Sequence, residues 1–133
     1  MSSVVLDSSA VLALILNEPG GQHVDALLDR LDRGEIAQIA LSALTWCEIL
    51  SRLHRNNDAM TASELAGLLE GVEVVSFTLP DAELAADFAR MDRSISLGDR
   101  ACLALARTRN ATAWTTDKVW QRLNIGVTVK VLR

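Results

Sequence analysis

Four acidic residues, spread along the whole chain, are the feature that most constrains what this sequence can fold into and do. Each lies where an expected strand ends, or where an expected helix begins or is interrupted: Asp7, Glu48, Asp99 and Asp117. In a small domain with a parallel sheet, all four places can lie along one edge of the sheet. Carboxylates that meet there repel one another and need a cation to stay together. Hard divalent ions such as Mg²⁺ prefer oxygen ligands, so the pattern predicts a metal site.

The length and composition of the chain indicate one globular domain spanning residues 1–133. Its 133 residues are an ordinary size for a single domain, and half of them are hydrophobic. No apolar run reaches the roughly 20 residues of a membrane-spanning helix, and the first residues lack the basic segment of a signal peptide. We therefore expect a cytoplasmic protein with no membrane partner. The net charge of −4 argues against a general nucleic-acid coat but does not exclude a nucleic-acid enzyme.

Short apolar runs alternate with segments of helical periodicity, which favours an α/β fold with a parallel sheet and right-handed crossovers. The runs lack clean alternation, as expected for strands covered on both faces. Strands are expected at Val4–Leu6, Gln38–Leu41, Val72–Phe77, Thr112–Thr115 and Val127–Val131. Helices are expected at Ala10–Leu16, Gly21–Arg33, Ser42–Arg55, Thr61–Glu70, Asp81–Arg93, Gly98–Arg109 and, as a short one, Lys118–Leu123. The two prolines are expected between these elements, at Pro19 and Pro80.

Each acid taken alone also has a purely structural interpretation. Asp7 could cap the first helix, and Asp99 could belong to a capping box. Asp117 could start the last short helix, and Glu48 could form an ion pair with Arg52 one turn later. The joint pattern favours the metal site, because independent caps would not be expected to converge on one cleft.

An acidic metal site of this kind suits the hydrolysis of phosphodiester bonds. That reaction needs a water made nucleophilic and a phosphate whose negative charge is neutralised, and Mg²⁺ or Mn²⁺ does both. No His, Ser or Lys triad is then required. Ser8, Ser9 and Thr115 could donate hydrogen bonds that hold the carboxylates in place, although turn and capping roles explain them equally well.

The cysteines, histidines and tryptophans indicate no second site. Cys47 and Cys102 lie in apolar helical stretches and are expected to be small buried thiols. His23 and His54 have no Cys or His at zinc-ligand spacing, so both are expected at the surface. Aromatic residues are scarce, and three are expected in the core rather than stacked on bases: Trp46, Trp114 and Trp120.

Four segments together resemble the PIN-domain ribonucleases, and specifically the VapC-type toxins of bacterial toxin–antitoxin pairs. The segments are Val5–Ala10, Thr45–Leu50, Ser96–Ala106 and Trp114–Trp120. Their order, their spacing and the total length agree, so the resemblance covers essentially the entire chain. The third segment, followed at the right distance by Thr-x-Asp, is the most specific part.

The resemblance implies a three-layer α/β/α PIN-like fold with a central parallel sheet, and an Mg²⁺-dependent endoribonuclease in which Mn²⁺ can substitute. The ion would be held mainly by Asp7 and Asp99, with Glu48 and Asp117 completing the catalytic pocket directly or through water. Thr115 matches the hydroxyl residue that the family has two positions before its last acid. The resemblance also implies RNA as the substrate, a cognate VapB-type antitoxin that inserts a segment near the pocket, and a homodimer.

Several basic residues lie near the inferred pocket and could hold the RNA backbone. The first candidates are Arg100 and Lys118, beside two of the acids; the others are Arg52, Arg55, Arg93 and Arg122. Three other functions stay open at this point: a silent interaction module whose acids only bind a cation, a phospho-acceptor domain, and a DNA-directed nuclease. Against the phospho-acceptor, Asp7-Ser8-Ser9 lacks a second aspartate, and no Lys follows a strand where a receiver domain would place one.

Overall fold

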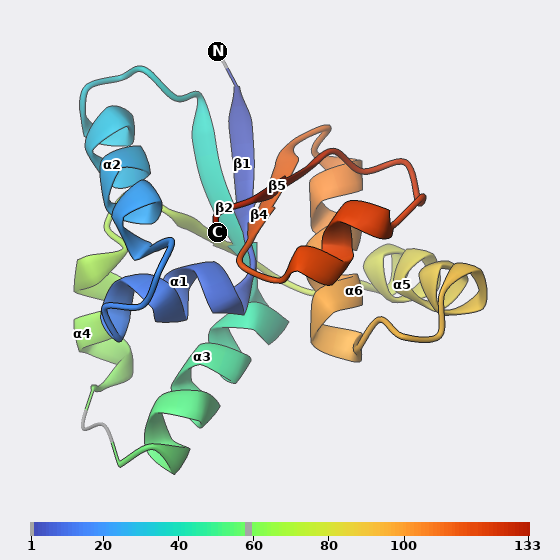
Figure 1. Ribbon diagram of the computed structural model, residues 1–133, viewed down its shortest axis with the longest axis horizontal. Coiled ribbons are helices and arrows are strands. Elements are labelled where there is room, and N and C mark those ends of the chain that lie inside the picture. The colour runs from blue at the N-terminus through green and yellow to red at the C-terminus, as the bar shows by residue number, and fades with distance from the viewer. Residues whose placement is uncertain (1, 58–59) are drawn as a thin grey trace.

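The computed structural model of the protein describes residues 2–57 and 60–133, which form a five-stranded sheet (Figure 1). The strands are β1 (Ser3–Leu6), β2 (Gln38–Ser42), β3 (Glu73–Val75), β4 (Thr112–Thr115) and β5 (Val129–Val131). Neighbouring strands are all parallel, in the order β3-β2-β1-β4-β5. The chain leaves β1 for β2 and β3 on one side and returns to β4 and β5 on the other. Ligands bind at such a switch point, which here lies between β1 and β4.

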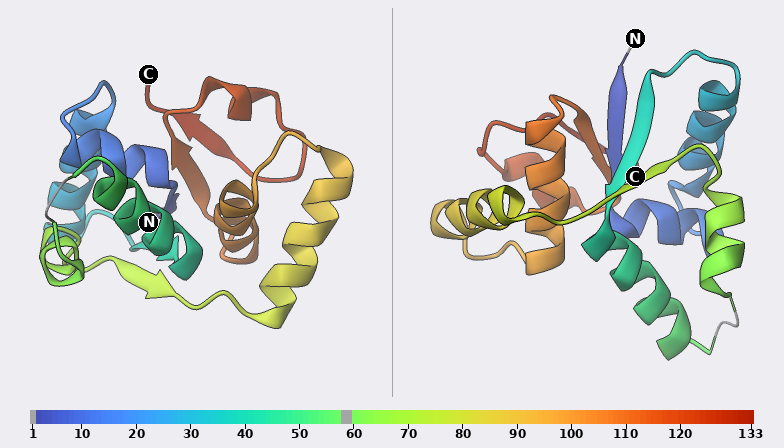
Figure 2. Two further views of the ribbon diagram at one scale, coloured as in Figure 1. Left: turned by 90° about the horizontal axis from the view of Figure 1, so that it is seen from below. Right: turned by 180° about the vertical axis from the view of Figure 1, so that it is seen from behind.

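Helices cover both faces of the sheet, as Figures 1 and 2 show. One face carries α1 (Ser8–Ile15), α2 (Gly21–Asp32), α4 (Ala62–Leu68) and the buried side of α3 (Ala43–Arg55). The other face carries α5 (Leu79–Met91), α6 (Leu97–Thr108) and the 3-10 helix η1 (Lys118–Arg122). This is a three-layer α/β/α fold with a parallel central sheet, so the fold predicted from the sequence is confirmed.

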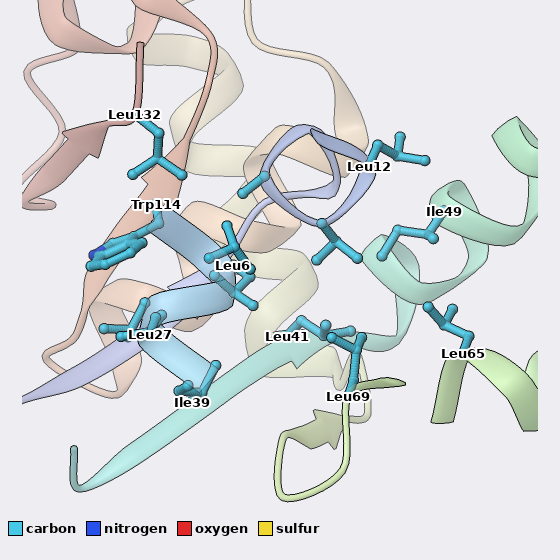
Figure 3. Packing of buried hydrophobic residues seen from close by; sticks show 14 of the residues in the cluster. Leu6, Leu12, Leu27, Ile39, Leu41, Ile49, Leu65, Leu69, Trp114 and Leu132 are labelled. Carbon is cyan, nitrogen blue, oxygen red and sulfur yellow. The ribbon is translucent and has the colours of Figure 1, made fainter. Parts of the chain in front are cut away.

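Successive residues of the central strands face opposite layers. On β1, Val4 and Leu6 join the apolar cluster with helices α1 to α4, whereas Val5 faces α5 and α6. On β4, Trp114 belongs to the cluster with helices α1 to α4, and Ala113 belongs to the cluster with α5 and α6. Figure 3 shows the first of these clusters from close by. Because both faces of the central strands are buried under helices, successive residues such as Val4, Val5 and Leu6 are all apolar, and these strands show no clean alternation in the sequence.

The strands and helices lie where the sequence predicts them, with ends that differ by at most two residues. The largest correction is at α5, which both begins and ends two residues earlier than predicted. Thr78 and Asp81 form a capping box there, with the Thr78 N–H donating to Asp81 Oδ2 at 2.9 Å. Pro80 therefore lies inside the first turn of α5 and not between elements, because its missing N–H is not needed at that place.

The two cysteines differ in exposure, so the prediction that both are buried is wrong for one of them. Cys102 is buried and Cys47 is exposed. The buried side of α3 consists of Thr45, Ile49 and Leu53. This side faces the core, and position 47 points away from it because successive helical residues turn by about 100°.

The expectations for the tryptophans and histidines are confirmed. The tryptophans pack in or against the core, and the histidines are exposed: Trp46, Trp114 and Trp120, and His23 and His54. Within the described chain, no helix combines the length and the apolar character that crossing a membrane requires.

Candidate active site

Asp7 is the deepest of the four acids and follows β1 directly. Its backbone N–H donates to the carbonyl of Trp114 at 2.9 Å, which extends the β1–β4 pairing up to the carboxylate. The residue is only 3 % exposed. It stands at the N-cap position of α1, yet its side chain accepts no capping hydrogen bond. Capping therefore does not explain why a carboxylate is buried at this position.

Two hydroxyl groups hold one oxygen of the Asp7 carboxylate. Ser9 Oγ and Thr115 Oγ1 both donate to Asp7 Oδ2, at 2.7 and 2.9 Å. Each hydroxyl oxygen also accepts a backbone N–H from the segment after β4. Thr116 donates to Ser9 at 3.0 Å, and Asp117 donates to Thr115 at 3.1 Å. These bonds orient the carboxylate and fix the direction of its second oxygen, Oδ1.

Glu48 reaches the same region from α3. Its carboxylate lies against the backbone of Gly98 at the start of α6, so closely that a Cβ added to Gly98 would overlap it. Among residues 2–57 and 60–133, Glu48 forms no ion pair with Arg52, so the alternative structural interpretation of this acid is wrong. Glu48 Oε1 and Asp7 Oδ1 are both buried without a hydrogen-bond partner in the described structure.

Asp99 and Asp117 approach from the other layer, on α6 and at the end of β4. Ser96 caps α6 by accepting the N–H of Asp99 at 3.2 Å, but the Asp99 side chain does not return a bond to form a capping box. Asp117 is exposed, and its Oδ1 accepts the Val119 N–H at 3.0 Å as the N-cap of η1. The two acids line one small recess. Asp117 thus has the capping role that the sequence allowed, together with a place beside Asp99.

Burial raises the pKa values of three of the acids, and the charges of neighbouring carboxylates raise those of Glu48 and Asp99 further. Burial raises the pKa of Asp7 in spite of its hydrogen bonds. Burial first, and then the charge of Asp7, raises the pKa of Glu48. Burial and the charge of Asp7 raise the pKa of Asp99 to about 7, with smaller contributions from Glu48 and Asp117. The charges of Asp7, Glu48 and Asp117 therefore all act on Asp99, as those of groups that share a pocket do.

Cys102 lies one turn after Asp99 on α6 and is fully buried. Burial raises the pKa of its thiol well above the usual value, and the charges of Asp7 and Asp99 raise it further. Only the thiolate of a cysteine is a good nucleophile or metal ligand. The carboxylate oxygens are therefore better candidate ligands for a cation than the Cys102 thiol.

The donor set of the pocket fits a hard divalent cation. Asp7 Oδ1 and Glu48 Oε1 are buried, unpaired oxygens, and leaving such groups unpaired costs free energy that a cation would recover. Among the described residues, however, no three acidic, His or Cys side chains already stand together as a complete metal cage. Asp7 is buried, Glu48 and Asp99 are partly exposed and Asp117 is exposed, so a bound ion would draw the carboxylates together.

The two basic residues predicted to contact RNA have different surroundings. Arg100 Nε donates to the carbonyl of Ile95 at 3.2 Å, and another guanidinium nitrogen donates to the carbonyl of Ala85 at 3.1 Å. Arg100 thus ties α5 and the following loop to α6, a packing role that competes with the predicted contact. Lys118 is exposed beside Asp117. For both residues, RNA contact stays a prediction.

The fold and the pocket define a small α/β/α domain with an acidic site at the carboxyl edge of its sheet. A comparison with protein families matches residues 4–126 to the PIN domain. The chain belongs to the PIN-domain family, which confirms the family resemblance seen in the sequence. A comparison with curated proteins found no match.

Solved structures of the same fold include toxin–antitoxin proteins. VapBC2 from Rickettsia felis, bound to a DNA fragment from its promoter, has a TM-score of 0.73 at 16 % identity, covering 98 % of this chain and 99 % of that chain. VapBC-1 from nontypeable Haemophilus influenzae has a TM-score of 0.69 at 16 % identity, covering 98 % of both chains. VapC20 from Mycobacterium tuberculosis, a toxin that cleaves the sarcin–ricin loop, has a TM-score of 0.68 at 18 % identity, covering 89 % and 92 %. At these identities, the likeness concerns the fold.

Proposed function

We propose that this protein is a metal-dependent endoribonuclease and the VapC-type toxin of a toxin–antitoxin pair. The observation that carries the proposal is the convergence of four interacting carboxylates at the switch point of the sheet, with Asp7 Oδ1 and Glu48 Oε1 buried and unpaired. Membership of the PIN-domain family supports nuclease chemistry. The sarcin–ricin loop that VapC20 cleaves supports RNA as the substrate class.

The chain would hold the metal and the water around it by its own carboxylates. Mg²⁺ or Mn²⁺, when bound, supplies a nucleophilic water and neutralises charge on the phosphate. Asp7 and Asp99 would be the main ligands, with Glu48 and Asp117 binding the ion directly or through water. Ser9 and Thr115 would orient the Asp7 carboxylate by holding Oδ2, which leaves the unpaired Oδ1 for the ion. Orientation of ligands by such hydrogen bonds is worth about 10- to 100-fold in activity.

We also propose a VapB-type antitoxin as the protein partner. The structural neighbours include toxin–antitoxin complexes from Rickettsia felis, Klebsiella pneumoniae and Salmonella typhimurium, which supports such a partner. A cytoplasmic location follows from a substrate and an antitoxin that both act inside the cell. The homodimer stays a prediction of the family resemblance.

Cleavage of RNA by the purified protein tests the proposed function. We expect cleavage of total cellular RNA with millimolar Mg²⁺ or Mn²⁺ and none with excess chelator, because four unneutralised carboxylates repel a phosphodiester. Gel analysis of the products measures the reaction, and single-stranded DNA is the control for RNA specificity. RNA that stays intact in Mg²⁺ and in Mn²⁺ at neutral pH would contradict the proposal. Equal cleavage of single-stranded DNA would contradict the part of the proposal that makes RNA the substrate.

Replacing Gly98 by Ala should displace Glu48 while the protein stays folded. The added Cβ would overlap the Glu48 carboxylate, which is the end of a flexible side chain and can rotate away. We expect RNA cleavage to fall about tenfold or more. The melting temperature should not fall, since Ala favours a helix over Gly by roughly 0.5–1 kcal/mol.

Gly67→Ala on α4 is the matched control, because a Cβ added there meets nothing within 4 Å. It should keep full activity and melt slightly higher than the wild type. Wild-type cleavage by Gly98→Ala, measured beside this control, would show that activity does not depend on the position of Glu48.

A further inference from the structure

We propose that a groove along α3 binds the phosphate backbone of the RNA that flanks the cleaved bond, and that Arg52 and Arg55 are its phosphate-binding residues. The inference rests on the proposed function and identifies how the substrate lies across the site. In this inference the main RNA contacts lie on α3, across the pocket from the start of α6, where the Arg100 guanidinium already donates to backbone carbonyls.

The groove adjoins the acidic pocket at Glu48. Glu48, Ser51, Arg52 and Arg55 occupy positions i, i+3, i+4 and i+7 of α3, which place them along one side of the helix. Together with Ser8 at the start of α1, they line a groove of about 310 Å³. Glu48 belongs to both the pocket and the groove, and Ser8 follows Asp7 directly. A strand bound along the groove would therefore reach the carboxylates.

The length of the groove suits a strand that continues past the cleaved bond. At a rise of 1.5 Å per helical residue, Arg52 and Arg55 lie about 6 Å and about 10 Å along the helix axis from Glu48. Figure 1 shows α3 running away from the carboxyl edge of the sheet, beside α1. The two guanidinium groups can thus contact phosphates beyond the one at the metal site.

The charges in the groove favour a polyanion as its occupant. Arg52 and Arg55 are both exposed, and within the described part of the chain neither forms an ion pair. Four other arginines do pair with acids: Arg30, Arg33, Arg90 and Arg109. A protein with a net charge of −4 and an acidic pocket repels RNA unless cations lie beside the pocket. Guanidinium groups bind phosphate through two parallel hydrogen bonds, which suits this task.

Cations near the end of a helix also complement the helix dipole, and this is the structural alternative. That role requires no groove and no connection to the acids. His54 is a basic residue in the same last turn, yet it does not line the groove. A position near the helix end therefore does not by itself place a side chain in the groove, as Arg52 and Arg55 are placed.

Binding of a single-stranded RNA oligomer tests the groove directly. The experiment uses the full chain with Asp99→Asn and Mg²⁺, so that bound RNA is not cleaved. Adding Arg52→Ala and Arg55→Ala should weaken binding about tenfold or more. The slope of log K against log salt should become shallower by about 1.4, which is 0.7 for each lost phosphate contact on a single strand. Arg52→Lys with Arg55→Lys keeps the charge and should retain most of the slope.

The matched control is Arg30→Ala with Arg33→Ala. This pair has the same spacing, also stands at the end of a helix and is exposed, but lies on and just after α2, away from the groove. It removes the same charge and should leave both the affinity and the salt slope close to those of the parent protein. Loss of the exposed ion pairs to Glu35 costs little stability.

Cleavage assays in the otherwise wild-type protein separate the groove from the metal site. Arg52→Ala with Arg55→Ala should raise KM for RNA, while hydrolysis of bis(p-nitrophenyl) phosphate, a diester without flanking phosphates, should stay within about twofold. Equal loss on both substrates would overturn the inference, since the arginines would then act on the pocket itself. Unchanged RNA affinity would also overturn it.

A further outcome identifies a protein as the occupant instead. If the variant binds RNA normally but escapes inhibition by the protein encoded beside it, the groove binds that protein and the inference is wrong. Failure of the proposed function is distinguishable: the wild type would then bind RNA through the arginines without cleaving it in Mg²⁺ or Mn²⁺.

Discussion

Asp99→Asn should lower metal-dependent RNA cleavage at least about a hundredfold while the protein stays folded. The amide keeps the shape of the side chain but removes the negative charge that attracts the ion, and loss of a ligand exceeds the 10- to 100-fold cost of losing a group that merely orients one. Initial rates on total RNA in Mg²⁺ measure the effect. Expression of the wild type should arrest growth, and expression of this variant should not.

Asp87→Asn is the control for Asp99→Asn. Asp87 is an exposed acid on α5 that pairs with Arg90, outside the pocket, and its replacement changes the net charge equally. It should cleave RNA and arrest growth as the wild type does. Cleavage by Asp99→Asn at the wild-type rate would contradict the proposal that Asp99 binds the metal. Absence of metal-dependent cleavage by the wild type would instead favour a silent interaction module.

The second large effect concerns stability without metal. Because the pKa of Asp99 is raised from 3.8 to about 7 in the folded protein, the folded state binds more protons than the unfolded state between these values. The free energy of unfolding should therefore fall as pH rises from about 4 to about 7, and the full deficit should persist above that range. The full shift would correspond to roughly 4 kcal/mol at about 1.4 kcal/mol per pKa unit. We expect a smaller deficit of about 1–2 kcal/mol, because solvent screens this partly exposed side chain.

Melting temperatures of the wild type and Asp99→Asn, in chelator at pH 4 and pH 8, measure this deficit. The variant should melt roughly 3–8 °C higher at pH 8 and nearly the same at pH 4. Comparing the two proteins isolates Asp99 from acids whose pKa is lowered, such as Glu35 and Glu73. Millimolar Mg²⁺ should raise the melting temperature of the wild type more than that of the variant. Equal melting at both pH values, with no response to Mg²⁺, would mean that the acids do not share a site.

The fold could be predicted from the sequence because its signals are local. Apolar runs such as Val4–Leu6 and Thr112–Thr115 stand between amphipathic segments, and their order alone indicates a parallel sheet. The predicted start of α5 differs from the observed one, although the sequence contains a helix-start pattern there. Thr78, followed three residues later by Asp81, is a capping-box pattern. The edge strands β3 and β5 are shorter than predicted because they have a partner on only one side.

The site could be predicted only in part. The four candidate acids can be found from their places after strands, in the first turn of a helix and, for Glu48, inside an apolar helical stretch, but their neighbours depend on tertiary packing. The close approach of Glu48 to Gly98 brings α3 against α6, and no local sequence pattern predicts such a contact between distant segments. The only hint in the sequence is a glycine in the first turn of an expected helix, where glycine lowers helix stability. Likewise, the carbonyl groups that bind Arg100 belong to α5 and the next loop.

The pairing of β1 with β4 has a consequence for the order in which the protein is made. Asp7 is synthesised at the start of the chain, and the Thr115 hydroxyl that orients it comes 108 residues later. Strands β1, β2 and β3 can pair while the ribosome is still extending the chain, since the N-terminal part of a chain folds first. Asp117 and Thr115 join the other acids only after β4 has been made and has paired with β1. A nascent chain that ends before β4 therefore lacks a complete acidic pocket, so the proposed ribonuclease is harmless to its own messenger RNA until nearly all of that message has been translated.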